Sequence, residues 1–505
     1  MTVNASHPDL ALLTDLYQLT MAYGYWKTGA ADREACFHVA FRKAPFTGGY
    51  AVACGLASAI EYLAELRFTE DDAAYLATLK GNDGRPLFES AFLDYLSALR
   101  FDLAIDAIPE GTVVFANEPL MRVTGPLLQA QIVETALLNL LNFQTLIATK
   151  AARVCEAARG DDVLEFGLRR AQGVDGALSA TRASYVGGCA ATSNVLAGKM
   201  FGIPVRGTHA HSWVMSFDSE LEAFERYADA LPNNCVFLVD TYDTVEGVRH
   251  AIEVGRRLRL RGSDMIGIRL DSGDLAYLSI EARKLLDEAG FPKAKILASN
   301  DLDEYLIADL KQQGATIAVW GVGTRLVTGY DQPALGGVYK LSALRNAQKE
   351  WEHKIKLSEQ SVKVSVPGVL QVRRFKDASG NFIADAIYDT LSGIGDGCTI
   401  VDPGDITRRK IIGPDVAWDD LLVPIFRDRR LVYEQPPLAQ VRQRACDQLA
   451  ALDPTIRRHT NPHRYPAGLE ERLYNLRNDM IFAARGLTPA RTGAAADAAW
   501  SNRHE

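Results

Sequence analysis

The sequence predicts an α/β fold, in which an irregular βα (TIM-like) barrel is joined to an α+β domain built from N-terminal and C-terminal segments. Two observations lead to this prediction. In the middle of the chain, apolar strand-like runs alternate with helical patterns about every 20–35 residues, which is typical of parallel βα units. Each run ends in polar residues, and the carboxyl ends of barrel strands are where such folds hold their chemistry.

The boundaries of this organisation follow from where the alternation begins and ends. We expect an N-terminal α+β domain over residues 1–128 and a catalytic βα barrel over residues 129–342. Residues 343–437 are expected to return to the α+β domain, and residues 438–505 to form a helical C-terminal tail.

The bulk properties indicate a globular protein of more than one domain. The 505 residues exceed what one ordinary hydrophobic core organises. A hydrophobic fraction of 48% and a charged fraction of 23% are typical of globular chains. The net charge of −8 argues against a general nucleic-acid binder but leaves room for a local basic pocket that binds a phosphorylated substrate.

Cysteine usage and the N-terminus favour a cytoplasmic protein. The seven cysteines include no CxxC pair, so neither a zinc framework nor a disulfide framework is expected. The opening residues show no basic stretch followed by an apolar run, so we expect no signal peptide. Polar residues such as Glu134 and Lys150 interrupt the longest apolar region, which therefore predicts a buried helix and no membrane span.

The N-terminal region shows helical and strand-like patterns in turn. Leu12, Leu16, Leu19 and Tyr23 have helical spacing, and Thr14 or Asp15 is placed to cap that helix. Alternation at Phe37, Val39 and Phe41 predicts a strand that ends in a turn at Gly48–Gly49. Further helices are expected over residues 56–66 and 69–79, and strands over residues 104–108, 113–115 and 120–123.

The central region supplies the βα rhythm. A long helix is expected from Gln129 to Arg159, and a Gly- and Ala-rich helix or turn over residues 185–197. Strands are expected over residues 163–167, 203–211, 236–240, 265–270, 296–299 and 317–320. Helices are expected over residues 219–231, 245–260, 275–290 and 302–314, with capping boxes at Ser219–Glu222 and Asp301–Glu304. Six such units are fewer than the eight of a regular barrel, so we expect an irregular one.

Beyond Lys340 the pattern becomes rich in hairpins. Strands are expected over residues 362–364, 371–375, 422–426 and 431–433, and helices over residues 438–452 and 468–484. The Ala-rich stretch over residues 486–505 is expected to be poorly ordered.

The stretch GIPVRGTHAHSW, from Gly202 to Trp213, is the leading candidate for the catalytic site. His211 follows what reads as a buried strand, and a histidine there can act as a base, a metal ligand or an acceptor of phosphate. On a strand, His209 and His211 would share one face, as a metal pair requires. That interpretation also needs a third ligand, and no other histidine falls at a strand end.

Two further strand ends carry groups suited to anionic ligands. Arg269 and Asp271 alternate at the end of MIGIRLDSGD, and an arginine there can bind a carboxylate or phosphate through two hydrogen bonds. Asp240 or Asp271 could hold Mg²⁺ with a diphosphate. Gly321, Gly323 and Thr324 form a GVGT turn whose backbone N–H groups could surround a phosphate.

Together these motifs resemble the nicotinate phosphoribosyltransferase family. The similar segments, in order, are TDLYQLTMAY, EFGLRRAQG, GTHAHSW, VDTYDT, GIRLDSGDL, ASNDLDE and VWGVGTRLVT, followed by KLSEQSVKVSVPG. They span the chain from about Leu12 to Tyr433 and are specific because so many occur in the expected order.

The resemblance implies an activity and a set of roles. It implies ATP-dependent transfer of phosphoribosyl from phosphoribosyl pyrophosphate (PRPP) to nicotinate, giving nicotinate mononucleotide and pyrophosphate for NAD salvage, with Mg²⁺. His211 would be phosphorylated by ATP, and Arg269 and Asp271 would be catalytic. The implied nicotinate contacts are Tyr17, Phe166, Thr208 and Arg269, and the implied phosphate contacts are Arg169, Gly321, Gly323 and Thr324. Tyr17 would come from the other subunit of a homodimer with shared active sites.

One residue departs from the family pattern, and three other functions remain open. Many family members have Leu, Met or Gln where His209 stands, which leaves its role open. The alternatives are a nicotinamide phosphoribosyltransferase, a metal-dependent amidohydrolase that uses the His209–His211 pair, and a non-catalytic sensor of nicotinate or nucleotide.

Overall fold

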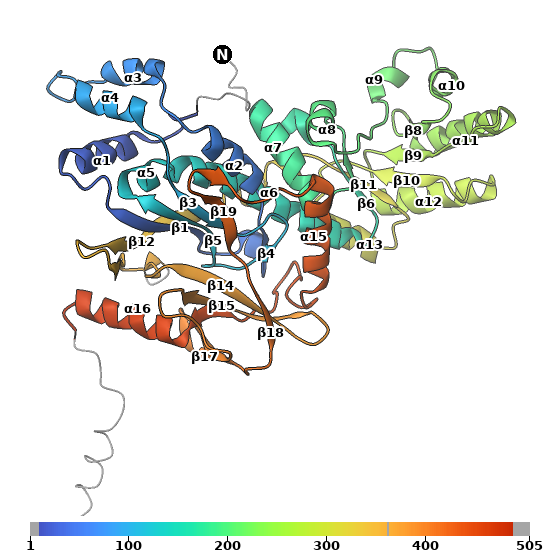
Figure 1. Cartoon of the computed structure of the whole chain (residues 1–505). Helices are drawn as coiled ribbons and strands as arrows, with labels where there is room; N and C mark the ends of the chain where they lie inside the picture. Colours follow the sequence, from blue (N-terminus) through green and yellow to red (C-terminus); the bar gives the residue numbers. More distant parts are fainter. Residues whose placement is uncertain (1–9, 361–362, 488–505) are drawn as a thin grey trace, which may run out of the picture.

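The computed structural model describes residues 10–360 and 363–487, which form three large sheets, a two-stranded ladder and the helices around them (Figure 1). Strands of the first sheet run in the order β13-β12-β1-β5-β3-β19-β20. Their bounds are β1 Glu34–Phe41, β3 Ala104–Ala107, β5 Pro119–Pro126, β12 Gly337–Arg345, β13 Trp351–His353, β19 Val423–Arg427 and β20 Arg430–Leu431. Because β12 pairs with β1 and β19 pairs with β3, late segments of the chain join the N-terminal sheet, and β13 and β20 extend it from β12 and β19.

The helices of the N-terminal region cover this sheet. They are α1 Leu16–Lys27, α2 Leu56–Glu65, α3 Glu70–Ala77, α4 Ser90–Ala98 and α5 Leu127–Ile132, and a small ladder joins β2 Ala51–Val52 to β4 Val113–Val114. Asp15 is the N-cap of α1 and forms a capping box with Gln18, which confirms the predicted start of that helix. Helix α4 was not expected from the sequence.

The expected long helix is divided into α5 and α6. Helix α6 spans Glu134–Ala158, and Val133 separates it from α5. Apolar residues of α6 belong to both of the large hydrophobic clusters, with Leu137 in the N-terminal one and Ile147 in the central one. The helix therefore serves both regions, which explains why its sequence is apolar over most of its length.

The second sheet consists of six parallel strands in the order β7-β6-β11-β10-β9-β8. Their bounds are β6 Asp162–Glu165, β7 Ala191–Thr192, β8 Val236–Leu238, β9 Gly267–Leu270, β10 Lys295–Ala298 and β11 Val319–Val322. Val205 extends the sheet by one parallel bridge to Thr192. Starting from β6, the order β6, β7, Val205, β8, β9, β10, β11 follows the chain, and β11 pairs with β6, as in a barrel. Among the described residues, however, no backbone pair joins Val205 to β8.

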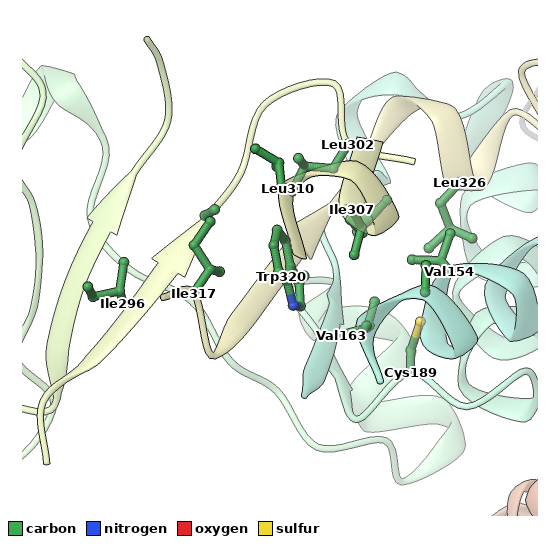
Figure 2. Close-up of a cluster of buried hydrophobic side chains, with 14 of the residues drawn as sticks. Val154, Val163, Cys189, Ile296, Leu302, Ile307, Leu310, Ile317, Trp320 and Leu326 are labelled. Atoms are coloured by element: carbon green, nitrogen blue, oxygen red, sulfur yellow. The ribbon is translucent and has the colours of Figure 1, made fainter. Parts of the chain in front are cut away.

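Side chains alternate between the two faces of this sheet. Val163, Ile296 and Trp320 lie on the face that packs under the helices (Figure 2), while their neighbours Leu164 and Leu297 belong to a smaller cluster on the other face. That other face borders a cavity of about 590 Å³. Every strand of the sheet contributes to its lining, through Leu164, Ala191, Val205, Val236, Gly267, Leu297 and Val319. The sheet therefore curves around an interior, which confirms the α/β class, while a closed ring of strands stays a prediction.

The segment around residues 185–211 differs most from expectation. Residues 203–211 do not form a strand beyond the single bridge at Val205, so that prediction is wrong. The sixth strand is β7, whose two residues are too few to give an alternating pattern. It lies between α7 Gly173–Val186 and α8 Val195–Phe201, where the sequence had suggested one helix or turn. His211 begins a one-turn helix, α9 His211–Val214.

Helices connect the strands of the second sheet, as predicted. They are α10 Glu220–Ala230, α11 Thr244–Leu260, α12 Leu275–Glu288, α13 Glu304–Gln312 and the short α14 Thr324–Val327. Ser219 caps α10 as expected, by accepting the Glu222 N–H. The cap of α13 is Asp303 and not Asp301, because the chain bends through positive φ at Asn300 and Asp301 before the helix begins.

The third sheet has the strand order β17-β16-β21-β15-β14-β18 and lies below the others in Figure 1. Its strands are β14 Leu370–Lys376, β15 Phe382–Asp389, β16 Cys398–Asp402, β17 Asp405–Ile412, β18 Ala417–Asp420 and β21 Ala467–Glu470, with α15 Leu438–Ala450 and α16 Glu471–Ala484 nearby. The expected helix over residues 468–484 therefore begins as strand β21, which pairs with β15 and β16. Lys363–Val364 form no strand, and residues 361–362 and the tail from residue 488 lie outside the described residues.

The predicted segments of residues 343–437 and 438–505 are thus not a simple return and a helical tail. Residues 370–420 build most of the third sheet, and β21 completes it from the predicted tail. In the described ranges, none of the helices has the length and apolar character to span a membrane.

Candidate active site

The carboxyl ends of the parallel strands enclose a cavity of about 430 Å³. The predicted site residues that line it are Phe166, Arg169, Thr208, Arg269, Asp271, Gly321, Gly323 and Thr324. They come from the ends of β6, β9 and β11 and from the segment after Val205. The fold thus brings together residues that are far apart in the sequence, as expected for parallel strands that end at one edge.

Arg269 lies at the centre of this cavity and is oriented by three side chains. Its Nε donates to Ser299 Oγ at 2.8 Å, Nη1 to Thr208 Oγ1 at 3.1 Å and Nη2 to Asp271 Oδ1 at 2.9 Å. The guanidinium carbon lies 5.8 Å from the centre of the Phe166 ring. Since a guanidinium carries five N–H groups, two remain for a ligand.

Asp271 is held as an anion by its surroundings. Burial raises the pKa of its carboxyl, but hydrogen bonds from Ser299 and Arg269, together with the charge of Arg269, outweigh burial and leave the pKa below its ordinary value. Its second oxygen, Oδ2, lies 3.7 Å from His211 Nε2. A fixed negative charge therefore faces the imidazole of His211.

His211 is oriented from its other nitrogen. His211 Nδ1 lies 3.1 Å from Thr241 Oγ1, within hydrogen-bond distance, and 40% of the side chain is exposed. The residue before Thr241, Asp240, accepts hydrogen bonds at 2.7 Å from the Asp271 N–H and the Ser272 hydroxyl. Asp240, Thr241, Asp271 and His211 thus form one connected group beside the cavity.

The glycines of the GVGT turn make room for an aromatic ring. A Cβ on Gly321 would lie 2.7 Å from Phe166 Cδ2, closer than real Cβ contacts, and one on Gly323 would lie 3.1 Å from the Phe166 carbonyl oxygen. Thr324 begins α14 directly after this turn. The two glycines therefore seat Phe166 at the cavity, a role that the sequence analysis had not assigned to them.

His209 does not pair with His211 as a metal ligand. Its Nε2 accepts the Leu238 N–H at 3.2 Å, and its ring packs against Tyr227 with centroids 4.9 Å apart. Burial lowers the pKa of His209 to about 4, so the ring is neutral near pH 7. Among the described residues, no group of three or more His, Cys, Asp or Glu side chains could hold a metal ion. The expectation of two rings on one strand face is therefore wrong, because residues 209–211 are not a strand.

Tyr17 lies on α1 and is not among the described residues that line the cavity. About half of this residue is exposed, and its neighbours Leu13, Leu16 and Met21 are exposed as well. Burial, followed by the charge of Glu134, raises the pKa of the Tyr17 phenol. Within one chain, Tyr17 therefore presents an aromatic ring on an exposed apolar face.

The sequence analysis missed two residues that hold the site together. Ser299 bonds Arg269 and also donates to Asp271, and Thr241 contacts His211. Ser299 directly follows the apolar run ILA, and Thr241 stands one residue beyond the apolar run VFLV, after Asp240. Their position near strand ends could have identified Ser299 and Thr241 from the sequence. Serine and threonine, however, gave no chemical reason to prefer them over the charged residues beside them.

Family models cover most of the chain in three overlapping or neighbouring parts. The nicotinate phosphoribosyltransferase N-terminal domain matches residues 12–142, the family model matches residues 162–378, and the C-terminal domain matches residues 370–477. The chain belongs to the nicotinate phosphoribosyltransferase family.

Relatives in this family are similar over almost their whole length. Nicotinate phosphoribosyltransferase of Bacillus subtilis is 47% identical over 470 residues, which cover 92% of this chain and 93% of that protein. The human protein of the same name is 35% identical, covering 93% of this chain and 96% of the human one. The crystal structure of human nicotinic acid phosphoribosyltransferase matches with a TM-score of 0.80 at 32% identity, covering 92% and 99% of the two chains.

Proposed function

We propose that this protein is an ATP-dependent nicotinate phosphoribosyltransferase of the ligase type. It transfers phosphoribosyl from PRPP to the ring nitrogen of nicotinate, releasing pyrophosphate and forming nicotinate mononucleotide for NAD salvage in the cytoplasm. The observation that carries the proposal is the single cavity in which Arg269, Thr208 and Phe166 meet the Gly321–Thr324 turn, in a chain of this family.

The two free N–H groups of Arg269 account for the choice of nicotinate. Three side chains fix the guanidinium in advance, so a carboxylate would meet donors that need no further ordering. The pyridine ring would lie beside Phe166, with Tyr17 of a second subunit on its other face. A nicotinamide offers one acceptor oxygen and turns its own NH2 group toward the guanidinium donors, which makes the nicotinamide enzyme the weaker candidate.

The transfer itself needs alignment and charge stabilisation more than covalent chemistry. Displacing pyrophosphate from the anomeric carbon gives the sugar cationic character, and the anionic Asp271 stands at the edge of the same cavity. Arg169 and the Gly321, Gly323 and Thr324 turn would bind phosphate groups. These residues line the same cavity as Thr208, so both substrates would have contacts within it.

Asp240 fits the role of magnesium ligand better than Asp271. Asp240 Oδ1 is buried and has no hydrogen-bond partner among the described residues, whereas Asp271 Oδ1 is engaged by Arg269 and Ser299 and its Oδ2 faces His211. One carboxylate suffices, since Mg²⁺ in such sites is usually bound by one or two carboxylates together with substrate phosphates. When bound, Mg²⁺ would neutralise the charge that develops on pyrophosphate.

His211 would couple ATP hydrolysis to the transfer through a phosphohistidine. Thr241 occupies Nδ1, so Nε2 is the nitrogen left to attack the γ-phosphorus of ATP, with ADP as the leaving group. Nε2 must carry no proton when it attacks, and Asp271, 3.7 Å away, would accept a proton that leaves this nitrogen. Hydrolysis of the phosphorus–nitrogen bond would later return the free imidazole.

One assay tests the proposal against its alternatives. Purified protein is incubated with PRPP, Mg²⁺ and either nicotinate or nicotinamide, with and without ATP, and pyrophosphate and nucleotide are measured. We expect nucleotide from nicotinate, faster with ATP. Nucleotide formed only from nicotinamide would indicate a nicotinamide phosphoribosyltransferase. Nicotinate binding without release of pyrophosphate would indicate a non-catalytic sensor. The amidohydrolase alternative loses its basis, because His209 is bonded to Leu238.

A further inference from the structure

We infer that Glu165 is a positioning residue, whose buried carboxylate holds two segments of the active site and helix α7 at one point. The inference rests on the proposed function, because it concerns how the nicotinate pocket is kept in shape. Glu165 is the last residue of β6, directly before Phe166, and does not itself line the cavity.

Three donors from three segments meet the Glu165 carboxylate. Oε1 accepts the Gly167 N–H, and Oε2 accepts the hydroxyls of Thr181 at 2.9 Å and Thr192 at 2.6 Å. Glu165 is 1% exposed, and no lysine or arginine of the described residues forms an ion pair with it. The carboxylate is therefore stabilised by neutral donors alone, and losing one would leave a buried polar group unpaired.

The neighbours of Glu165 require a side chain that only accepts hydrogen bonds. A side chain that both donates and accepts, such as an amide, does not fit. Asn194 donates its backbone N–H to Thr192 Oγ1 and its side-chain amide to Thr181 Oγ1. Both hydroxyls are thus acceptors toward Asn194 and must donate their own protons toward Glu165. An ionised carboxylate only accepts, whereas the amide of a glutamine would turn two of its own protons toward these donors.

Two of the three donors, Gly167 and Thr192, lead directly to residues of the site. Gly167 carries the loop between Phe166 and Arg169, and it can approach α14 only as glycine, since a Cβ would lie 2.3 Å from Val327 Cγ1. Thr192 exchanges backbone hydrogen bonds with Pro204 at 3.0 Å and Arg206 at 2.9 Å, the segment that leads to Thr208. Glu165 thereby fixes the Phe166 loop relative to the Thr208 segment, the two walls that nicotinate would touch.

The first test is Glu165→Gln, which keeps the size of the side chain and reverses part of its hydrogen bonding. We expect the KM for nicotinate to rise about tenfold or more, the equivalent of one hydrogen bond to a charged group. The KM for PRPP should change less, because Phe166 and Thr208 would face the pyridine. Hydrogen exchange at the peptide containing Gly167 should quicken, since a single amide oxygen cannot accept from Gly167 and from both threonine hydroxyls as the carboxylate does.

Hydroxyl variants separate positioning from packing. Thr181→Ser keeps the donor and should retain nearly the normal nicotinate KM, whereas Thr181→Val keeps the shape and should raise it. In the Glu165→Gln background, Thr181→Val should add little, because the two residues act through one bond. Glu118→Gln is the control for changing a buried glutamate outside this site: Glu118 is also fully buried and accepts the Phe115 N–H at 2.8 Å, although burial and the neighbouring Asp385 raise the pKa of its carboxyl.

The outcomes distinguish this inference from the proposed function. If Glu165→Gln leaves both the nicotinate KM and exchange at Gly167 unchanged, Glu165 does not position the site. If all variants lose the same stability and the protein that remains folded has normal KM values for nicotinate and PRPP, the role of Glu165 is structural only and the inference is wrong. If the wild type binds but does not convert nicotinate, the proposed function fails, while exchange at Gly167 still tests Glu165.

Discussion

At the scale of single residues, preorganisation distinguishes this site from an ordinary polar surface. Arg269 is fixed by three hydrogen bonds and lies beside an aromatic ring, and Asp271 is kept ionised by the same arginine. Such groups have lost their conformational freedom before a ligand arrives, so little entropy is lost on binding.

Removing the guanidinium should weaken nicotinate binding selectively. We expect Arg269→Ala to cost on the order of 2–4 kcal/mol of nicotinate binding, as for charge-assisted hydrogen bonds left unmade. The KM for PRPP should change far less. Arg249, which is exposed on α11, provides the control variant Arg249→Ala. A normal nicotinate KM with weakened PRPP binding would instead assign Arg269 to phosphate.

His211 should carry a phosphoryl group during turnover. Incubation with γ-labelled ATP is expected to give a label that is labile in acid and stable in base, as a phosphoramidate is, and peptide mapping should place it on His211. His211→Asn should abolish both the label and the stimulation by ATP, while a slow transfer without ATP persists. Full ATP stimulation in this variant, or a label on His209, would refute the assignment.

His209 should make the protein sensitive to acid. Because burial lowers its pKa to about 4 in the folded state, below the unfolded value near 6.5, the unfolded chain binds a proton first. The contribution of the neutral His209 to the free energy of unfolding is therefore complete above about pH 6.5 and falls as the pH drops toward 4. Urea unfolding of His209→Gln, which can still accept the Leu238 N–H, should show a flatter pH dependence than the wild type. An unchanged slope would contradict the prediction.

At the scale of elements, the site depends on how closely β11 approaches the end of β6. Gly321 pairs with Leu164 across the two strands, and its missing side chain is the space that the Phe166 ring occupies. A glycine motif that looks like a phosphate loop is thus also a packing device for the aromatic wall.

Filling that space should displace Phe166. Gly321→Ala is expected to raise the nicotinate KM and to lower stability by roughly 1–3 kcal/mol, as overpacking of a close contact does. Combining it with Phe166→Leu should recover stability but not nicotinate affinity. Gly176→Ala in helix α7 is the matched control, because its Cβ meets nothing closer than 4.0 Å. Normal kinetics in Gly321→Ala would show that the ring is free to move.

At the scale of the whole molecule, one chain supplies a cavity without Tyr17. The exposed α1 face that carries Tyr17, Leu16 and Met21 is apolar, as interfaces often are. A second subunit could place this face over the cavity, which would give the shared sites that the family resemblance implies.

Hybrid dimers test this arrangement. Tyr17→Ala and His211→Ala should each be inactive or severely impaired alone. When they are mixed under conditions where subunits exchange, hybrid dimers would contain one site with both residues intact, so some activity should return. Light scattering would establish the dimer, and demonstrated exchange without any recovery would exclude sites completed in trans.

The sequence by itself determined most strands of the second sheet and predicted most of the residues that line the cavity. Alternating apolar runs predicted β6, β8, β9, β10 and β11 to within a few residues, because each buries a face long enough to leave a pattern. Polar residues at strand ends predicted Arg269, Asp271 and the GVGT turn, since parallel strands end together.

Only the tertiary structure decided what depends on contacts between distant segments. Strand β7 is too short to show a period, and the segment with His209 and His211 leaves the sheet after one bridge, so the supposed metal pair separates. Ser299, Thr241 and Glu165 look ordinary in sequence, because their roles come from partners supplied by other elements. Hydrogen bonds formed across more than one strand leave no local pattern, and for that reason the arrangement of the site required the fold.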